Sequence, residues 1–163
     1  MNKYFILIIC LTLLVGCTLG NTPTARVEEM LSNYQRLDKS INISYTNITD
    51  DTNISNDLKD RYEELIKKQY KNLSYEVKDE EIDGDTAVVT ISVEVMDYKE
   101  EINKFNKEEY DLNNYHDHVL DALRDTDDKA VYTLEISLTK DKNDTWVVDD
   151  LTKESRDKLL GIY

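Results

Sequence analysis

Residues 83–95, DGDTAVVTISVEV, decide the fold of this chain. After the Asp-Gly pair, every second residue from Ala87 to Val95 is apolar, which is the period of a β-strand that buries one face. The buried face would hold Ala87, Val89, Ile91, Val93 and Val95. Asp-Gly is a strong turn signal, so we expect this strand to be the second half of a β-hairpin.

The length of the turn decides which face the first strand of this hairpin buries. A two-residue turn at 83–84 would place Val77 opposite Thr90, on the polar face. A three-residue loop at 82–84 keeps Val77 on the apolar face. The pairs of that register are Val77 with Val89 and Tyr75 with Ile91. Because a slip of one residue reverses every side chain, we predict the longer loop.

A second hairpin is expected near the C-terminus, where the same alternation returns. One face of its long strand carries Ala130, Tyr132, Leu134, Ile136 and Leu138. A polar loop at 140–144 leads to a returning strand that contains Trp146 and Val148. We expect Trp146 to face inward, because a large apolar side chain gains about 25 cal/mol for each Å² that it removes from water.

Helices are expected on both sides of the first hairpin. Thr22-Pro23 is typical of a helix start, with threonine as the N-cap and proline in the first turn. Apolar residues recur at helical spacing as Val27, Met30, Leu31, Tyr34, Leu37 and Ile41, and again as Leu58, Tyr62, Leu65, Ile66 and Tyr70 within 56–72. We predict a broken helix at 98–124 and a short terminal helix that contains Leu159 and Leu160.

The order helix, helix, hairpin, helix, hairpin predicts an α+β fold. We expect amphipathic helices packed on one face of a curved antiparallel sheet of about four strands, in a cone-like arrangement. A chain of this length suits one domain, and a second core is not expected.

The N-terminal residues 1–16 have the pattern of a secretory signal, with Lys3 followed by an apolar run. Leu14-Val15-Gly16-Cys17 resembles the lipobox of bacterial prolipoproteins. This resemblance implies cleavage between Gly16 and Cys17 and a diacylglyceryl group on the sulfur of Cys17. Two acyl chains are enough for stable anchoring. We therefore expect a lipoprotein anchored to the cell membrane by lipid, on the extracytoplasmic face.

Cleavage would leave a lipidated tether at 17–21 and a single α+β domain at 22–163. Cys10 would leave with the signal and the thiol of Cys17 would carry lipid, which excludes a cysteine nucleophile, a cysteine-based zinc site and a disulfide. Without Lys3, 19 basic residues face 34 acidic ones, a net charge of −15. Such a charge disfavours nucleic acid as a partner.

The lipobox, two amphipathic helices, a valine-rich hairpin and a final strand with Trp146 together resemble small Gram-positive lipoproteins of the nuclear-transport-factor-two-like superfamily, which has a cystatin-like α+β fold. The resemblance covers about residues 22–151 and includes no diagnostic motif. The long helix between the hairpins fits that fold only approximately. Members include enzymes, binding modules and assembly parts, so the resemblance implies neither a function nor a catalytic residue.

The two histidines of the chain, His116 and His118, are the first candidates for a metal site. On a helix, residues two apart point about 200° away from each other and cannot share a metal. We expect both to be solvated on a helix face and predict no metal site. The acidic group Asp121, Asp125, Asp127 and Asp128 lacks the spacing and the glycine of a helix-loop-helix calcium site, so we expect exposed carboxylates.

Tyrosine is abundant, with eleven residues against two phenylalanines. We select Tyr34, Tyr62 and Trp146 as residues that line either a ligand pocket or the core. The chain has no nucleophile elbow and no phosphate-binding loop, and 34 carboxylates offer no means of choosing an acid–base pair. We predict no catalytic residue and no cofactor.

These features favour a non-catalytic binding or accessory domain of the cell envelope. Its partners would be the membrane, through the lipid anchor, and an envelope protein or a small ligand. Two alternatives stay open: an enzyme that uses a buried Asp or Glu in a pocket, and a structural part of a conjugation or wall-synthesis complex.

Overall fold

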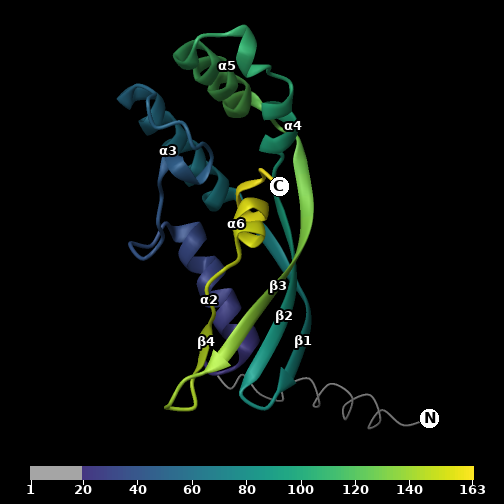
Figure 1. Ribbon diagram of the computed structural model, residues 1–163. Helices are drawn as coiled ribbons and strands as arrows, with labels where there is room; N and C mark the ends of the chain where they lie inside the picture. The colour runs from purple at the N-terminus through teal and green to yellow at the C-terminus, as the bar shows by residue number, and fades with distance from the viewer. Residues whose placement is uncertain (1–19) are drawn as a thin grey trace, which may run out of the picture.

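The computed structural model describes residues 20–163 and shows an α+β fold (Figure 1). Its α-helices are α2 (Pro23–Arg36), α3 (Asn56–Asn72), α4 (Tyr98–Asn103), α5 (Leu112–Asp125) and α6 (Lys153–Leu160), and its 3-10 helices are η2 (Tyr45–Asn47) and η3 (Lys107–Glu109). Four antiparallel strands form one sheet in chain order: β1 (Ser74–Asp83), β2 (Thr86–Met96), β3 (Lys129–Lys140) and β4 (Trp146–Val148). No helix in this range is both long and apolar enough to cross a membrane. The lipobox, the cleavage site and Cys17 lie outside the described residues.

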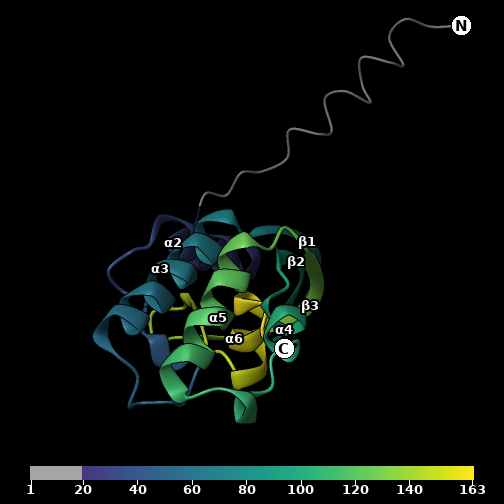
Figure 2. The same ribbon diagram turned by 90° about the horizontal axis from the view of Figure 1, so that it is seen from above.

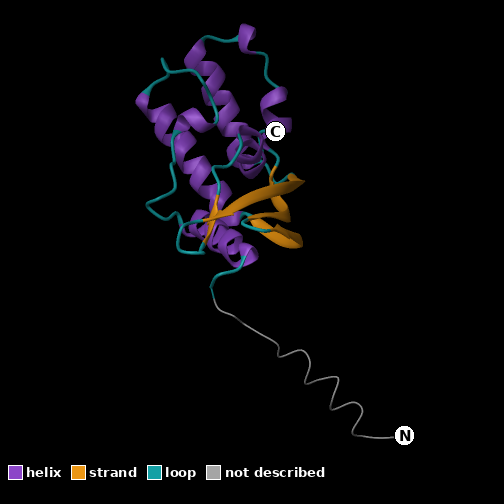
Figure 3. Ribbon diagram, turned by 60° about the horizontal axis from the view of Figure 1, so that its bottom comes forward, coloured by secondary structure: helices purple, strands orange, loops and turns teal. Residues whose placement is uncertain are grey.

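The sheet buries one face, as the alternation of apolar residues predicts. Along β2, Val89, Ile91 and Val93 are completely buried, and the residues between them are partly exposed. On β3 the buried residues are Leu134, Ile136 and Leu138. Helices α2, α3 and α6 lie on this face, and no helix of residues 20–163 lies on the opposite face (Figures 2 and 3). The predicted fold class is therefore confirmed.

The turn of the first hairpin differs from the prediction. Strands β1 and β2 are joined by the two residues Gly84-Asp85, and Val77 lies opposite Ile91 instead of Val89. A β-bulge at position 78 adds one residue to β1 and so returns Val77 to the apolar face. The predicted three-residue loop was wrong because it assumed an unbroken ladder. Gly84 adopts the left-handed conformation in this turn, with a φ of 60°.

Helix α2 begins at the predicted residue and ends before the end of the predicted apolar stripe. The side chain of Thr22 accepts a hydrogen bond from the amide of Ala25, and proline occupies the first turn. The helix ends at Arg36 because Leu37 adopts the left-handed conformation, with a φ of 53°. The predicted helical stripe therefore stops before Ile41, which belongs to the irregular segment that follows.

Buried residues form two clusters. The first lies between the sheet and α2, the C-terminal half of α3 and α6. The second comes from the segment before α3, from α3 itself and from α4 and α5, and contains Ile54, Leu58, Tyr62, Leu65, Tyr98, Val119, Leu120 and Leu123. Helix α5 extends beyond the upper end of the strands in Figure 1 and packs on α3 and α4. Ile48 and Ile162 contact both clusters.

Trp146 faces inward, as predicted. Its side chain is 6% exposed and belongs to the first cluster. Its backbone amide donates to the Oδ1 atom of Asn21 at 3.0 Å, and the ammonium of Lys140 lies 5.2 Å from its ring centre. The short strand β4 thus closes the sheet beside the start of α2.

Candidate functional site

A cavity of about 490 Å³ lies between the C-terminal end of α2, the segment 42–50, α3 and α6, and we call it the tyrosine cavity. Its apolar wall consists of Ile48, Leu160, Ile162 and the rings of two tyrosines, Tyr34 and Tyr70. Its polar wall contains Asn42, Thr46, Asn47, Asp50, Lys153, Arg156 and Asp157. A volume of this size is typical of small-molecule sites, which range from about 300 to 1,000 Å³.

The two tyrosines meet edge to face inside this cavity. Their ring centres are 4.8 Å apart with an angle of 70° between the planes. Tyr70 is 4% exposed, and Tyr34 is partly buried. Burial raises the pKa of both hydroxyl groups, so each carries its proton at neutral pH and can donate a hydrogen bond. Neither hydroxyl forms a hydrogen bond with a residue in the range 20–163.

Arg156 supplies a positive charge that is not paired with any carboxylate of residues 20–163. One of its nitrogen atoms donates to the carbonyl oxygen of Leu151, and it forms no salt bridge with any residue that the structure describes. Its charge opposes the effect of burial on the pKa of both Tyr34 and Tyr70, and all three residues line the tyrosine cavity. An arginine has five N–H donors, so several stay free for a ligand.

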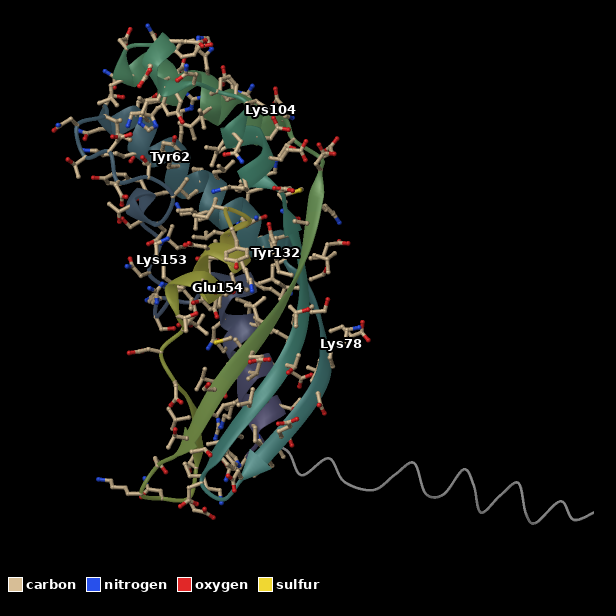
Figure 4. The ribbon with its side chains drawn as sticks, turned by 45° about the vertical axis from the view of Figure 1, so that its right-hand side comes forward. Tyr62, Lys78, Lys104, Tyr132, Lys153 and Glu154 are labelled. Carbon is tan, nitrogen blue, oxygen red and sulfur yellow. The ribbon has the colours of Figure 1, made fainter. Side chains whose placement is uncertain are left out.

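Of the two acidic residues in the cavity, Asp157 forms a salt bridge and Asp50 forms none with a residue in the range 20–163. The Oδ2 atom of Asp157 lies 2.5 Å from the ammonium of Lys153, which begins α6 and is labelled in Figure 4. Asp50 is exposed and forms no salt bridge with a residue between 20 and 163. One unpaired positive group, Arg156, and one unpaired negative group, Asp50, therefore line the same cavity.

The irregular segment after α2 forms one wall of the cavity. Leu37 turns the chain out of the helix, and the carboxylate of Asp38 then accepts hydrogen bonds from the amide and hydroxyl of Ser40. Farther along, the side-chain amide of Asn47 donates to the carbonyl oxygen of Asn42 at 3.1 Å. Local hydrogen bonds of this kind give a segment without long helices or strands a defined shape.

A second group of polar side chains forms hydrogen bonds within itself, and none of its members lines the tyrosine cavity. This closed group consists of Asp51, His116 and Tyr62. The hydroxyl of Tyr62 lies 2.7 Å from Nδ1 of His116, and Nε2 of His116 lies 3.0 Å from the carboxylate of Asp51. Burial lowers the pKa of His116 although Asp51 opposes this effect, so the imidazole is neutral, donates to Asp51 and accepts from Tyr62. The ammonium of Lys107, 2.5 Å from Asp51, lowers the pKa of that carboxyl group.

This closed group corrects the prediction for the histidines. His118 is exposed and packs against Tyr110, but His116 is only 1% exposed because its position on α5 belongs to the apolar stripe that faces α3. Since Tyr62 is 2% exposed as well, a substrate cannot reach either group. The arrangement ties α3, α5 and the segment near Asp51 together.

The residues selected from the sequence as pocket or core residues are not brought together. Tyr34 lines the tyrosine cavity, Tyr62 lies in the second cluster among the upper helices of Figure 4, and Trp146 borders a separate groove of about 370 Å³ beside α2. Sequence reasoning missed Tyr70 and Arg156 as cavity residues. Tyr70 already stood in the apolar stripe of α3, whereas nothing in the sequence distinguishes Arg156 from other surface residues.

The acidic group at the end of α5 is exposed, as predicted. Asp121 pairs with Arg61 at 2.8 Å, Asp125 pairs with Arg124 at 2.9 Å, and Asp127 and Asp128 are exposed as well. Among residues 20–163, no set of three or more His, Cys, Asp or Glu side chains has an arrangement that could hold a metal ion.

Comparisons of the chain with family models, with curated proteins and with solved structures find no match. The resemblance to the nuclear-transport-factor-two-like superfamily stays a prediction. The assignment of the site therefore rests on its own geometry.

Proposed function

We propose that this chain is an extracytoplasmic lipoprotein, anchored to the cell membrane through Cys17, whose domain binds a small molecule without transforming it. The observation that carries this proposal is the tyrosine cavity, where the hydroxyls of Tyr34 and Tyr70 have no partner among the described residues. Polar groups inside proteins normally form hydrogen bonds. Unpaired donors in a cavity of ligand size therefore favour a binding role.

The described residues offer no buried carboxyl group for acid–base catalysis in a pocket. Such catalysis needs a titratable group within hydrogen-bonding reach of the substrate. No Asp or Glu side chain in the range 20–163 is buried, and His116 is enclosed by its partners Tyr62 and Asp51. An enzyme that acts through a buried carboxyl group has no candidate residue in this range. Binding, by contrast, needs only the donors and apolar walls of the tyrosine cavity.

Anchoring at Cys17 would hold one particular end of the domain near the membrane. The side-chain amide of Asn21 donates to the carbonyl oxygen of Asp144 at 2.9 Å, and its Oδ1 accepts from the amide of Trp146 at 3.0 Å. The four residue steps from Cys17 to Asn21 span at most about 14 Å. The proposal therefore places the loop between β3 and β4 close to the membrane surface and α5 at the far end (Figure 1).

The binding role is tested on the full chain, purified in a mild detergent. Thermal unfolding is followed with and without the low-molecular-weight fraction of an extract from the envelope of the producing cells. A ligand that binds only the folded state raises Tm. We expect this rise for the unaltered chain and for the control Arg124→Gln, and its loss in Arg156→Gln. Equal shifts in all three proteins, or no shift in the unaltered chain, would contradict a binding role for this cavity.

The anchor is tested separately by the change Cys17→Ala. Cell fractionation should show the protein in the medium or as an unprocessed precursor, because the sulfur that carries the lipid is gone. Mature protein of normal mass that stays with the membrane would refute the anchor.

A further inference from the structure

We propose that the ligand of the tyrosine cavity is a small zwitterion, an amino acid or the end of a short peptide. Its carboxylate binds Arg156 together with the hydroxyls of Tyr34 and Tyr70, and its ammonium group faces Asp50. This inference rests on the proposed function and specifies the chemistry of the same site.

The donors of the cavity suit a carboxylate. Arg156 has a planar fork of N–H groups, of which one nitrogen is engaged with the carbonyl oxygen of Leu151. Guanidinium forks bind carboxylates through two parallel hydrogen bonds. Tyr34 and Tyr70 add two protonated hydroxyls beside this charge, and neither has a partner within the described residues. The ring of Tyr70 is buried, with 4% of the residue exposed, and its hydroxyl opens to the cavity, where a ligand can accept its hydrogen bond.

The acidic residues of the cavity argue against a phosphate. Asp50 and Asp157 share the cavity with Arg156, and the whole chain has a formal net charge of −14. A doubly charged anion would be repelled by both. A zwitterion has no net charge and would place its ammonium group at Asp50, the one acidic cavity residue without a salt bridge among residues 20–163.

The remaining wall fits an apolar side chain. Ile48, Leu160 and Ile162 lie in the cavity with the two tyrosine rings, and the volume of about 490 Å³ accommodates a molecule of one or two amino-acid residues. Most of the surface that a small ligand buries is apolar, and a few polar groups fix its orientation. The cavity has both components.

The test uses isothermal titration calorimetry on the full chain in detergent. The probes are L-phenylalanine, L-phenylalaninamide, which lacks the carboxylate, 3-phenylpropionate, which lacks the amine, and inorganic phosphate. We expect L-phenylalanine to bind about tenfold more tightly than either truncated analogue, because each analogue loses one charge-assisted contact. Glycyl-L-phenylalanine, whose charges are farther apart, distinguishes a free amino acid from a peptide end as the source of the zwitterion.

Two variants assign the two ends of the ligand. Arg156→Gln should weaken the binding of L-phenylalanine and of 3-phenylpropionate about tenfold and leave the amide unaffected. Asp50→Asn should weaken the binding of L-phenylalanine and of the amide and leave 3-phenylpropionate unaffected. The matched controls Arg124→Gln and Asp127→Asn change exposed residues on and after α5 and should alter none of these affinities.

Equal binding of L-phenylalanine and its amide, or preferred binding of phosphate, would overturn the zwitterion. If neither L-phenylalanine nor the dipeptide binds, the ligand class is wrong. The proposed function would still stand in that case if the envelope extract raises Tm in an Arg156-dependent way. If the extract also has no effect, both fail.

Discussion

Two tyrosines of the same helix show what separates a closed site from an open one. Tyr62 and Tyr70 both lie on α3 and are 2% and 4% exposed. Each meets another aromatic ring edge to face, His116 at 5.6 Å for Tyr62 and Tyr34 at 4.8 Å for Tyr70. The hydroxyl of Tyr62 has a partner 2.7 Å away, whereas that of Tyr70 has none within residues 20–163.

This difference means that burial alone does not identify a functional tyrosine. A buried hydroxyl with a partner stabilises the fold, because breaking the pair would leave a polar atom without a hydrogen bond. A hydroxyl on a buried ring that opens to a cavity, and has no partner in the protein, contributes little to the fold and is free to bind another molecule. Tyr62 belongs to the first kind and Tyr70 to the second.

The largest expected effect tests whether the first cluster, on which the tyrosine cavity lies, gains its stability from apolar packing. Trp146, 6% exposed in that cluster, is replaced by alanine. Loss of a buried aromatic side chain should lower the free energy of unfolding by about 3–5 kcal/mol, measured by urea denaturation. The control is Val147→Ala on the same strand, where the side chain is 49% exposed and the loss should stay within about 0.5 kcal/mol. Similar losses in both variants would contradict the core position of Trp146.

The next effect concerns the closed site. Tyr62→Phe keeps the ring but removes the hydroxyl, so Nδ1 of the buried His116 loses its partner. We expect the free energy of unfolding to fall by about 1–3 kcal/mol. A variant as stable as the unaltered chain would show that the hydroxyl of Tyr62 is not needed, and the contrast with Tyr70 would then disappear.

The closed site should also make stability depend on pH. Burial holds the pKa of His116 below its ordinary value of 6.5, so the unfolded chain takes up a proton at this residue before the folded chain does. Stability is therefore complete above this pH and falls as the pH decreases below it, by at most about 1.4 kcal/mol per pH unit. The pKa of Asp51 is lowered, so the stability that this carboxylate provides is lost only when the pH falls below its ordinary value of 3.8.

Urea denaturation between pH 7 and pH 5 measures this dependence. Its slope should correspond to the uptake of at most about one proton on unfolding. His116→Gln should flatten the slope. The matched control His118→Gln changes the exposed histidine two residues away on α5 and should keep it. Equal slopes in all three proteins would show that His116 does not titrate as a buried group.

The regular elements could be predicted from the sequence because they follow from periodic patterns. The predicted bounds 56–72 of the second helix agree with α3, and the inward face of β2 agrees residue by residue. The errors occurred where a single residue interrupts a pattern. The bulge at position 78 changed the register of the hairpin, and Leu37 ended α2 before Ile41. Val77 beside the bulge and Leu37 both pack against the first cluster, and such contacts between distant parts of the chain are not contained in a periodic pattern.

The candidate site was less predictable for a related reason. The sequence indicates Tyr34 as a pocket or core residue and places Tyr70 on the apolar face of a predicted helix. The two tyrosines of the cavity could therefore be predicted. The polar half depends on which charged residues remain unpaired. Arg156 and Lys153 both lie on α6, yet Lys153 has a carboxylate partner and Arg156 has none among the described residues. Such a difference depends on distances in the folded chain, and composition or spacing does not contain it.

The smallest expected effect is at Tyr70, and it completes the comparison. Tyr70→Phe removes a hydroxyl that has no partner within residues 20–163, so the free energy of unfolding should change by less than about 0.5 kcal/mol. Urea denaturation of the full chain without ligand measures this change beside that of Tyr62→Phe. The same variant should bind L-phenylalanine more weakly, because the ligand carboxylate loses one donor. A loss of stability as large as that of Tyr62→Phe would mean that the hydroxyl of Tyr70 serves the fold. Unchanged stability together with weakened binding would place it in the ligand site.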